Sequence, residues 1–118
     1  MIRPDRELQV YLCREPVDMR KAMDGLAVLV EEAMELDPFS AAAFVFCNRA
    51  RDKVKILVWE RNGFVVWYKR LEQERFRWPE CGEGERLALT GQELNWLLDG
   101  LDIAHVPAHK RLYYQTVG

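Results

Sequence analysis

The residues of this chain best suited to chemistry are cations and aromatic rings gathered in one segment. Residues 47–78 carry nine Lys or Arg against four Asp or Glu, a local charge of +5 within 118 residues whose total charge is −2. Cations bind phosphates and aromatic rings stack on nucleobases, so the combination is typical of surfaces that bind nucleic acid. The net negative total argues against a protein that coats DNA over its whole surface.

Strand alternation divides the stretch 54–59 between two faces. One face carries Val54, Ile56 and Val58, and the other carries Lys55, Leu57 and Trp59. We expect the β-branched face to be core. The other face would then offer cations and rings to single strands or phosphates. The alternative is that the rings pack under a helix while the lysines only extend to solvent at the edge.

The dipeptide Asn62-Gly63 predicts a hairpin, because both residues accept the positive φ that tight turns require. Two registers remain open. A two-residue turn at Asn62-Gly63 pairs Trp59 with Val66 and sets Tyr68 and Arg70 beside Lys55. A three-residue turn that starts at Arg61 sets other residues there, namely Trp67 and Lys69.

Further cations lie in turns and at a helix end. The turn before the hairpin carries three of them: Arg49, Arg51 and Lys53. At a loop tip they would reach a partner without disturbing the core, although a solvated turn is the alternative. Asp18 is a suitable helix N-cap, which would place Arg20 and Lys21 in a first turn. The helix dipole disfavours cations there, which hints at a role beyond helix stability. The alternative is that the adjacent Asp18 pairs with them.

No pattern predicts catalysis, a metal or a cofactor. Carboxylates are plentiful, but no spacing forces them to converge on a cation. His105 and His109 have a helical metal-binding spacing, yet Pro107 between them interrupts a helix. Three cysteines, Cys13, Cys47 and Cys81, stand 34 residues apart each time, which indicates neither a disulfide framework nor a zinc knuckle. Without a signal-peptide core or membrane-length apolar stretch, we expect a cytoplasmic protein.

The remaining pattern predicts an α+β domain. A short strand at 10–13 precedes a helix over about 18–35, which Asp37-Pro38 ends. Short connections join β-rich runs at 43–47, 54–59 and 64–71, so we expect an antiparallel meander of three to five strands. A capping box of Thr90 and Glu93 begins a second helix over about 91–99, with Gly100 at its end. Both helices should pack on the meander within one domain spanning 1–118, with a core of about 9–103 and a loose tail at 104–118.

A series of short motifs carries a resemblance to a known family. In chain order they are Pro16-Val17-Asp18-Met19-Arg20-Lys21, Asp24-Gly25-Leu26, Asp37-Pro38-Phe39-Ser40, Phe44-Val45-Phe46, Asn48-Arg49, Lys55-Ile56-Leu57, Trp59, Gly63-Phe64, Lys69-Arg70-Leu71, Arg75-Phe76 and Trp78-Pro79. Over about residues 9–103 this order and spacing resembles the TnpB-type accessory proteins of the bacterial insertion sequence family sixty-six. Three positions depart from the pattern without affecting the assignment: Ala42, Cys47 and Glu60.

The resemblance implies a non-catalytic accessory protein needed for DNA transposition. A separate, larger transposase would be its partner, and element DNA a second one. The basic-aromatic hairpin face would bind the DNA, the transposase or both, while the alternative is a pure protein adaptor with no DNA binding of its own. Self-association is left open by the apolar content. The candidate contact residues are Arg20, Lys21, Arg49, Arg51, Lys53, Lys55, Trp59, Trp67, Lys69, Arg70, Arg75 and Trp78.

Overall fold

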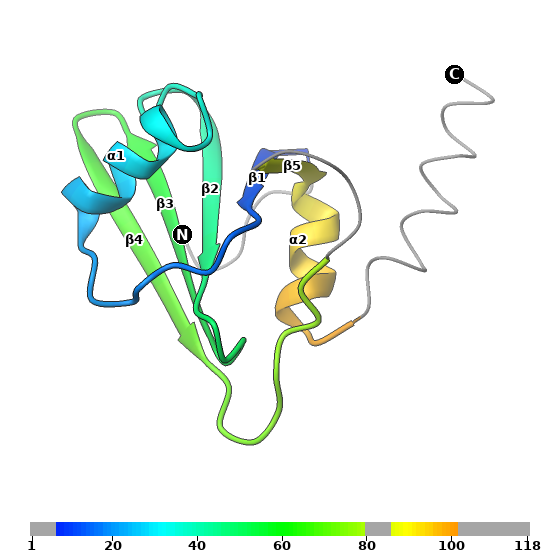
Figure 1. Ribbon diagram of the computed structural model, residues 1–118. Coiled ribbons are helices and arrows are strands. Elements are labelled where there is room, and N and C mark those ends of the chain that lie inside the picture. Colours follow the sequence, from blue (N-terminus) through cyan, green and yellow to red (C-terminus); the bar gives the residue numbers. More distant parts are fainter. Residues whose placement is uncertain (1–6, 80–85, 102–118) are drawn as a thin grey trace.

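A five-stranded mixed sheet with a helix on each face organises residues 7–79 and 86–101, the part of the chain described by the computed structural model (Figure 1). The sheet order is β4-β3-β2-β1-β5. The elements are β1 (Gln9–Cys13), α1 (Met23–Glu32), β2 (Ala42–Cys47), β3 (Lys53–Glu60), β4 (Gly63–Arg70), β5 (Arg86–Thr90) and α2 (Gly91–Leu98). The predicted α+β class is therefore confirmed.

The prediction of a purely antiparallel meander was wrong. Strands β2, β3 and β4 form the expected antiparallel series, but β1 pairs with β2 in parallel, with Gln9 opposite Ala42. A parallel pair needs a crossover connection, and the segment containing α1 supplies it between β1 and β2. Strand, helix and strand thus form one unit at the centre of the sheet.

A fifth strand occupies a stretch that the sequence reading left unassigned. Strand β5 pairs antiparallel with β1 and sets Leu89 opposite Val10. Residues 75–78, which follow β4, do not form a strand. Instead the main-chain N–H of Phe76 donates to the carbonyl of Arg51 at 2.7 Å. The chain after β4 is therefore fixed to the turn between β2 and β3.

Helix α1 begins later and ends earlier than predicted. Asp18 is no N-cap, since the cap position is Ala22 and carries no side-chain hydrogen bond. Asp18 instead accepts hydrogen bonds from the main chain and side chain of Arg20, which holds this segment in a turn. At the other end Glu35 takes a φ of 56°, which the helix cannot continue through. Arg20 and Lys21 therefore precede the helix rather than belong to its first turn.

The second helix and its signals were predicted correctly. Thr90 accepts from the main-chain N–H of Glu93, and the Glu93 carboxylate accepts in return from the N–H of Thr90. Gly100 follows the helix with a φ of 88°, as a left-handed C-terminal residue should. The capping box could be predicted because it involves two residues only three positions apart in the sequence.

The hairpin is confirmed, but its turn lies one residue earlier than expected. Glu60 pairs with Gly63, so Arg61 and Asn62 form the loop. The shift sets Phe64 rather than Val66 opposite Trp59, and the two rings meet edge to face at 5.0 Å. Cross-strand aromatic pairs of this kind stabilise one register over another. Each β3 residue thus faces a β4 residue two positions earlier than predicted. A displacement of two positions keeps every side chain on the same face of the sheet, so Tyr68 still lies beside Lys55, as the two-residue alternative required.

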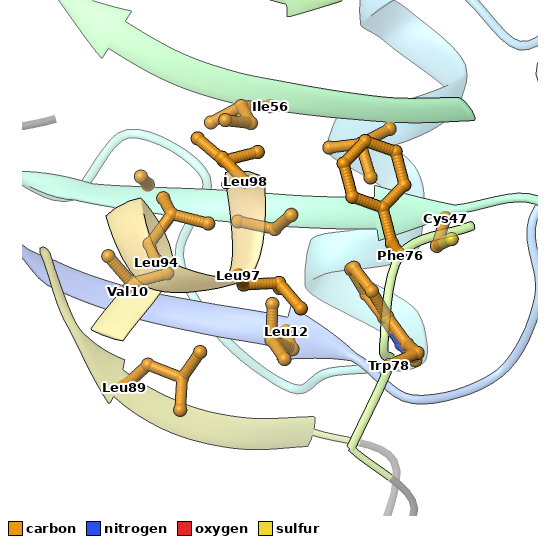
Figure 2. Close-up of a cluster of buried hydrophobic side chains, with 13 residues drawn as sticks. Val10, Leu12, Cys47, Ile56, Phe76, Trp78, Leu89, Leu94, Leu97 and Leu98 are labelled. Atoms are coloured by element: carbon orange, nitrogen blue, oxygen red, sulfur yellow. The ribbon is translucent and has the colours of Figure 1, made fainter. Parts of the chain in front are cut away.

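Two hydrophobic clusters cover the two faces of the sheet. The α2-side core joins α2 to Val10, Leu12, Val54 and Ile56 (Figure 2). Phe76 and Trp78 complete this cluster from the segment after β4, beside α2. The α1-side core packs α1 against other strand residues, among them Phe44, Phe46 and Leu57. Both faces of the hairpin are thus partly core, whereas the sequence reading assigned only one.

Some expectations fall outside the described residues. The tail at 104–118, Cys81 and the pair His105 and His109 belong to this group. Among the described helices none is long and apolar enough to cross a membrane.

Candidate nucleic-acid interface

An open groove of about 620 Å³ lies where the segment before α1 meets the turn between β2 and β3. Strand β3 begins at this groove and β4 ends beside it. Its lining residues are Pro16, Val17, Asp18, Met19, Arg20, Asn48, Arg49, Ala50, Lys53 and Tyr68. Three segments distant in sequence thus converge on one surface.

The groove brings together three of the predicted contact residues around one exposed ring. Arg20, Arg49 and Lys53 all line it, and Tyr68, which is 50% exposed, presents its ring there. Arg70 pairs with Lys53 across the β3–β4 ladder and so lies at the same end of the hairpin. At such a place the cations can contact phosphates while the aromatic ring stacks on a base.

Lys55 fixes one wall of this groove. Its ammonium group donates to the carbonyl oxygens of Met19 and Lys21, at 2.8 and 3.0 Å. The same nitrogen lies 5.8 Å from the centre of the Tyr68 ring. A main-chain bond of 2.8 Å from Val17 to the carbonyl of Cys47 ties down the same segment. Lys55 therefore positions the segment before α1, and its charge is engaged by carbonyl dipoles.

The opposite wall is held by a side-chain amide. The Asn48 Oδ1 accepts from the main-chain N–H groups of Asp52 and Lys53, both at 3.1 Å, and its Nδ2 donates to the Asp52 carboxylate at 2.7 Å. The bond from Asn48 holds the pKa of Asp52 below its ordinary value. Arg51 takes a φ of 65° in this turn, which points the chain back toward β3. The turn that presents Arg49 is thus built by its own side chains.

Most cations of the groove already have an anionic neighbour. Arg20 meets Asp18 at 2.7 Å, and this hydrogen bond lowers the pKa of the Asp18 carboxyl to about 2. At 3.8 Å, Lys53 is more loosely paired with Asp52. Arg49 is exposed, and no described carboxylate lies within ion-pair distance of it. Arg49 and Lys53 are therefore the cations most available to an incoming anion.

Arg70 is a further paired cation at this end of the hairpin. Its guanidinium donates to the Glu72 carboxylate at 2.9 Å, which raises the pKa of Arg70. Such exposed pairs are weak and exchange readily with a stronger anion. Arg70 thus borders the groove without being locked away from it.

Other predicted contact residues lie elsewhere. Trp67 and Lys69 face α2, and Trp78 is buried there with its indole N–H donating to the carbonyl of Cys13 at 3.4 Å. Trp59 stands near the hairpin turn, against Phe39 and Phe64. The remaining three, which do not line the groove, are Lys21, Arg51 and Arg75. The structure therefore divides the predicted set instead of gathering it on one face.

The alternative that Asp18 pairs with its neighbouring cations is confirmed for Arg20. Sequence reasoning missed one feature of this region. Phe39 was named only within a family motif and not as a candidate contact residue, although its ring contacts Trp59 and Phe64. Its place directly after Asp37-Pro38, where a helix must end, is the signal that could have pointed to an exposed ring.

Comparison with known proteins assigns the family. The family model described as IS66 Orf2 like protein matches residues 8–108. Two uncharacterized proteins of Sinorhizobium fredii (strain NBRC 101917 / NGR234) are similar to the chain: y4jC is 34% identical and y4hO is 31% identical. The first alignment covers 90% of both chains, and the second covers 89% of this chain and 90% of the relative. No solved structure matches significantly. The chain belongs to the IS66 Orf2-like family, whose members are accessory proteins of insertion sequences.

Proposed function

We propose that the groove binds the phosphates of nucleic acid, and that the protein thereby assists DNA transposition of its insertion sequence without catalysing it. The observation that carries this proposal is the convergence of Arg20, Arg49 and Lys53 on the exposed ring of Tyr68. The cations would contact consecutive phosphates, and the ring would take a base. Element DNA is the expected ligand, held alongside the separate transposase.

Single strands suit this groove better than duplex. A half-exposed tyrosine can stack on an unpaired base, which contributes about 1–3 kcal/mol. The bases of a duplex are already stacked on one another and leave no face for the ring. Three phosphate contacts on a single strand would give a log–log salt slope of roughly −2. Because Asp18 and Asp52 lie beside the same cations, we expect an affinity well below that of dedicated DNA-coating proteins.

The test is fluorescence anisotropy of labelled element-end DNA, as single strands and as duplex, over a salt series. The variant Arg49→Ala/Lys53→Ala should weaken single-strand binding by about tenfold or more and flatten the salt slope. Tyr68→Ala should lower the affinity for single strands while leaving the slope unchanged, because it removes stacking and no charge.

The matched control is Arg61→Ala/Arg77→Ala, which removes two exposed cations outside the groove. It should bind like the wild type. Absence of binding at low salt, or equal losses in the control and in the groove variant, would remove the groove as a nucleic-acid site.

The pure adaptor is the second candidate. It is favoured by the ion pairs that already occupy Arg20 and Arg70, since these leave fewer cations free for phosphates. Binding of the transposase by a chain that shows no affinity for DNA would establish it.

A further inference from the structure

Three aromatic rings meet at the end of the hairpin remote from the groove. Phe39 lies 5.0 Å from Trp59 and 5.2 Å from Phe64, and Trp59 and Phe64 are themselves 5.0 Å apart. Phe39 is 53% exposed, the largest exposure among the described large hydrophobic residues. Burying such a ring against a partner would gain more than burying an isolated apolar residue, because its neighbours already fix its orientation.

The segment that leads to Phe39 is rich in carboxylates. Residues 22–41 contain five carboxylates and no Lys or Arg. All five side chains are exposed: Asp24, Glu31, Glu32, Glu35 and Asp37. Asp37 is held beside the rings, since its carboxylate accepts from the main-chain N–H of Phe39 at 2.9 Å. Two cations also border this surface: Arg86, whose guanidinium donates to the carbonyl of Glu35 at 3.4 Å, and Arg61 in the hairpin loop. The carboxylates outnumber them, so phosphates would be repelled and a cationic protein segment attracted.

The ring cluster and the groove are well separated. The cluster includes the pair Trp59 and Phe64, and the groove lies at the pair Lys53 and Arg70 of the same ladder. Six residue steps along a strand span roughly 20 Å. Ligands at the two ends can therefore be bound at once.

We propose that Phe39 and Trp59, bordered by the carboxylates of residues 22–41, form a docking surface for a protein partner. The partner segment would carry an apolar or aromatic anchor flanked by Lys or Arg. Central aromatic residues with a charged rim are the arrangement that concentrates binding energy at protein interfaces. This surface is independent of the proposed nucleic-acid groove, and together the two would make the chain a bridge between a polyanion and a basic protein.

The experiment uses the full chain and, as the probe, the purified transposase of the same element, with affinity measured by calorimetry or biolayer interferometry. Phe39→Ser should weaken binding by about tenfold or more. Glu31→Gln/Glu32→Gln/Glu35→Gln should slow association and reduce its dependence on salt. Both variants should retain wild-type binding of single-stranded DNA, so that failure of this surface and failure of the groove are told apart.

The matched control is Met23→Ser, which removes another exposed apolar side chain, 42% exposed, that lies on α1 and outside the ring cluster. It should bind the transposase within about twofold of the wild type. Three results would overturn the proposal: no binding of the transposase by the wild type, equal binding by Phe39→Ser, or a wild-type dimer in sedimentation that Phe39→Ser dissociates. The last would assign the rings to contact between two copies.

Discussion

The ammonium group of Lys69 donates a 2.9 Å hydrogen bond to the carbonyl oxygen of Leu98, the last residue of α2. The end of a helix leaves carbonyls without intrahelical partners and carries partial negative charge, so a cation there is doubly favourable. On the opposite face of the sheet, Lys55 makes the equivalent contact with the segment before α1. Two lysines of one hairpin thus hold the chain on both sides of the sheet.

Replacing Lys69 should cost stability and not DNA affinity. Lys69→Met removes the bond to Leu98 and its favourable charge, so the free energy of unfolding should fall by about 1 kcal/mol in urea titration. Lys69→Arg should recover part of the loss. An affinity for single-stranded DNA that drops while stability stays unchanged would contradict this assignment and restore Lys69 as a contact residue.

Replacing Lys55 should affect both properties, but by an indirect route. Lys55→Met removes the hydrogen bonds to the carbonyls of Met19 and Lys21, so the free energy of unfolding should fall by about 1–2 kcal/mol. The affinity for DNA should also fall, because the groove wall that these bonds hold becomes looser. The log–log salt slope of binding should stay at the wild-type value, because no phosphate contact is lost. A slope reduced by nearly one contact would mean that Lys55 meets phosphate directly.

Local signals explain what could be predicted from the sequence. The capping box of Thr90 and Glu93 and the left-handed Gly100 depend on a few adjacent residues, and both proved correct. The same holds for the hairpin, whose strands were right although Asn62-Gly63 misplaced the turn by one residue. Where a feature depends only on neighbours along the chain, its residue types define it.

Contacts between distant segments explain what could not be predicted. The parallel pairing of β1 with β2 depends on how the helix packs back on the sheet, and nothing in residues 9–13 records it. The segment before α1 is held by Lys55, which bonds the carbonyls of Met19 and Lys21 from a distant strand. The candidate groove was the hardest feature to predict, because Arg20, Arg49 and Tyr68 come together only when three distant segments have folded against one another.

The burial of both hairpin faces leads to a stability prediction. Leu57 lies on the same face as Lys55, yet it is fully buried against α1. Leu57→Ala should therefore lower the free energy of unfolding by about 2–5 kcal/mol. The neighbouring Val58→Ala, at a part-exposed position on the α2 face, is the comparison and should cost less. A smaller loss for Leu57→Ala than for Val58→Ala would contradict the α1-side core.

The buried cysteines give a prediction that depends on pH. Burial raises the pKa of the Cys47 thiol to about 12 from 9.0, so the folded state favours the neutral thiol. Its contribution to stability is complete below 9.0, the value expected in the unfolded chain, and is lost as the pH rises through about 12. At about pH 8 the thiolate is therefore scarce, and Cys47 should react slowly with a thiol reagent.

Cys13 is buried as well, so in a Cys81→Ser background the folded protein should show no fast-reacting thiol among its cysteines. Unfolding in guanidinium should release both thiols. Rapid labelling of Cys47 in the folded state, read by mass spectrometry of its peptide, would contradict this burial. Because the Cys47 thiol lies in the α2-side core together with Phe76 and Trp78, such exposure would mean that this core opens in solution.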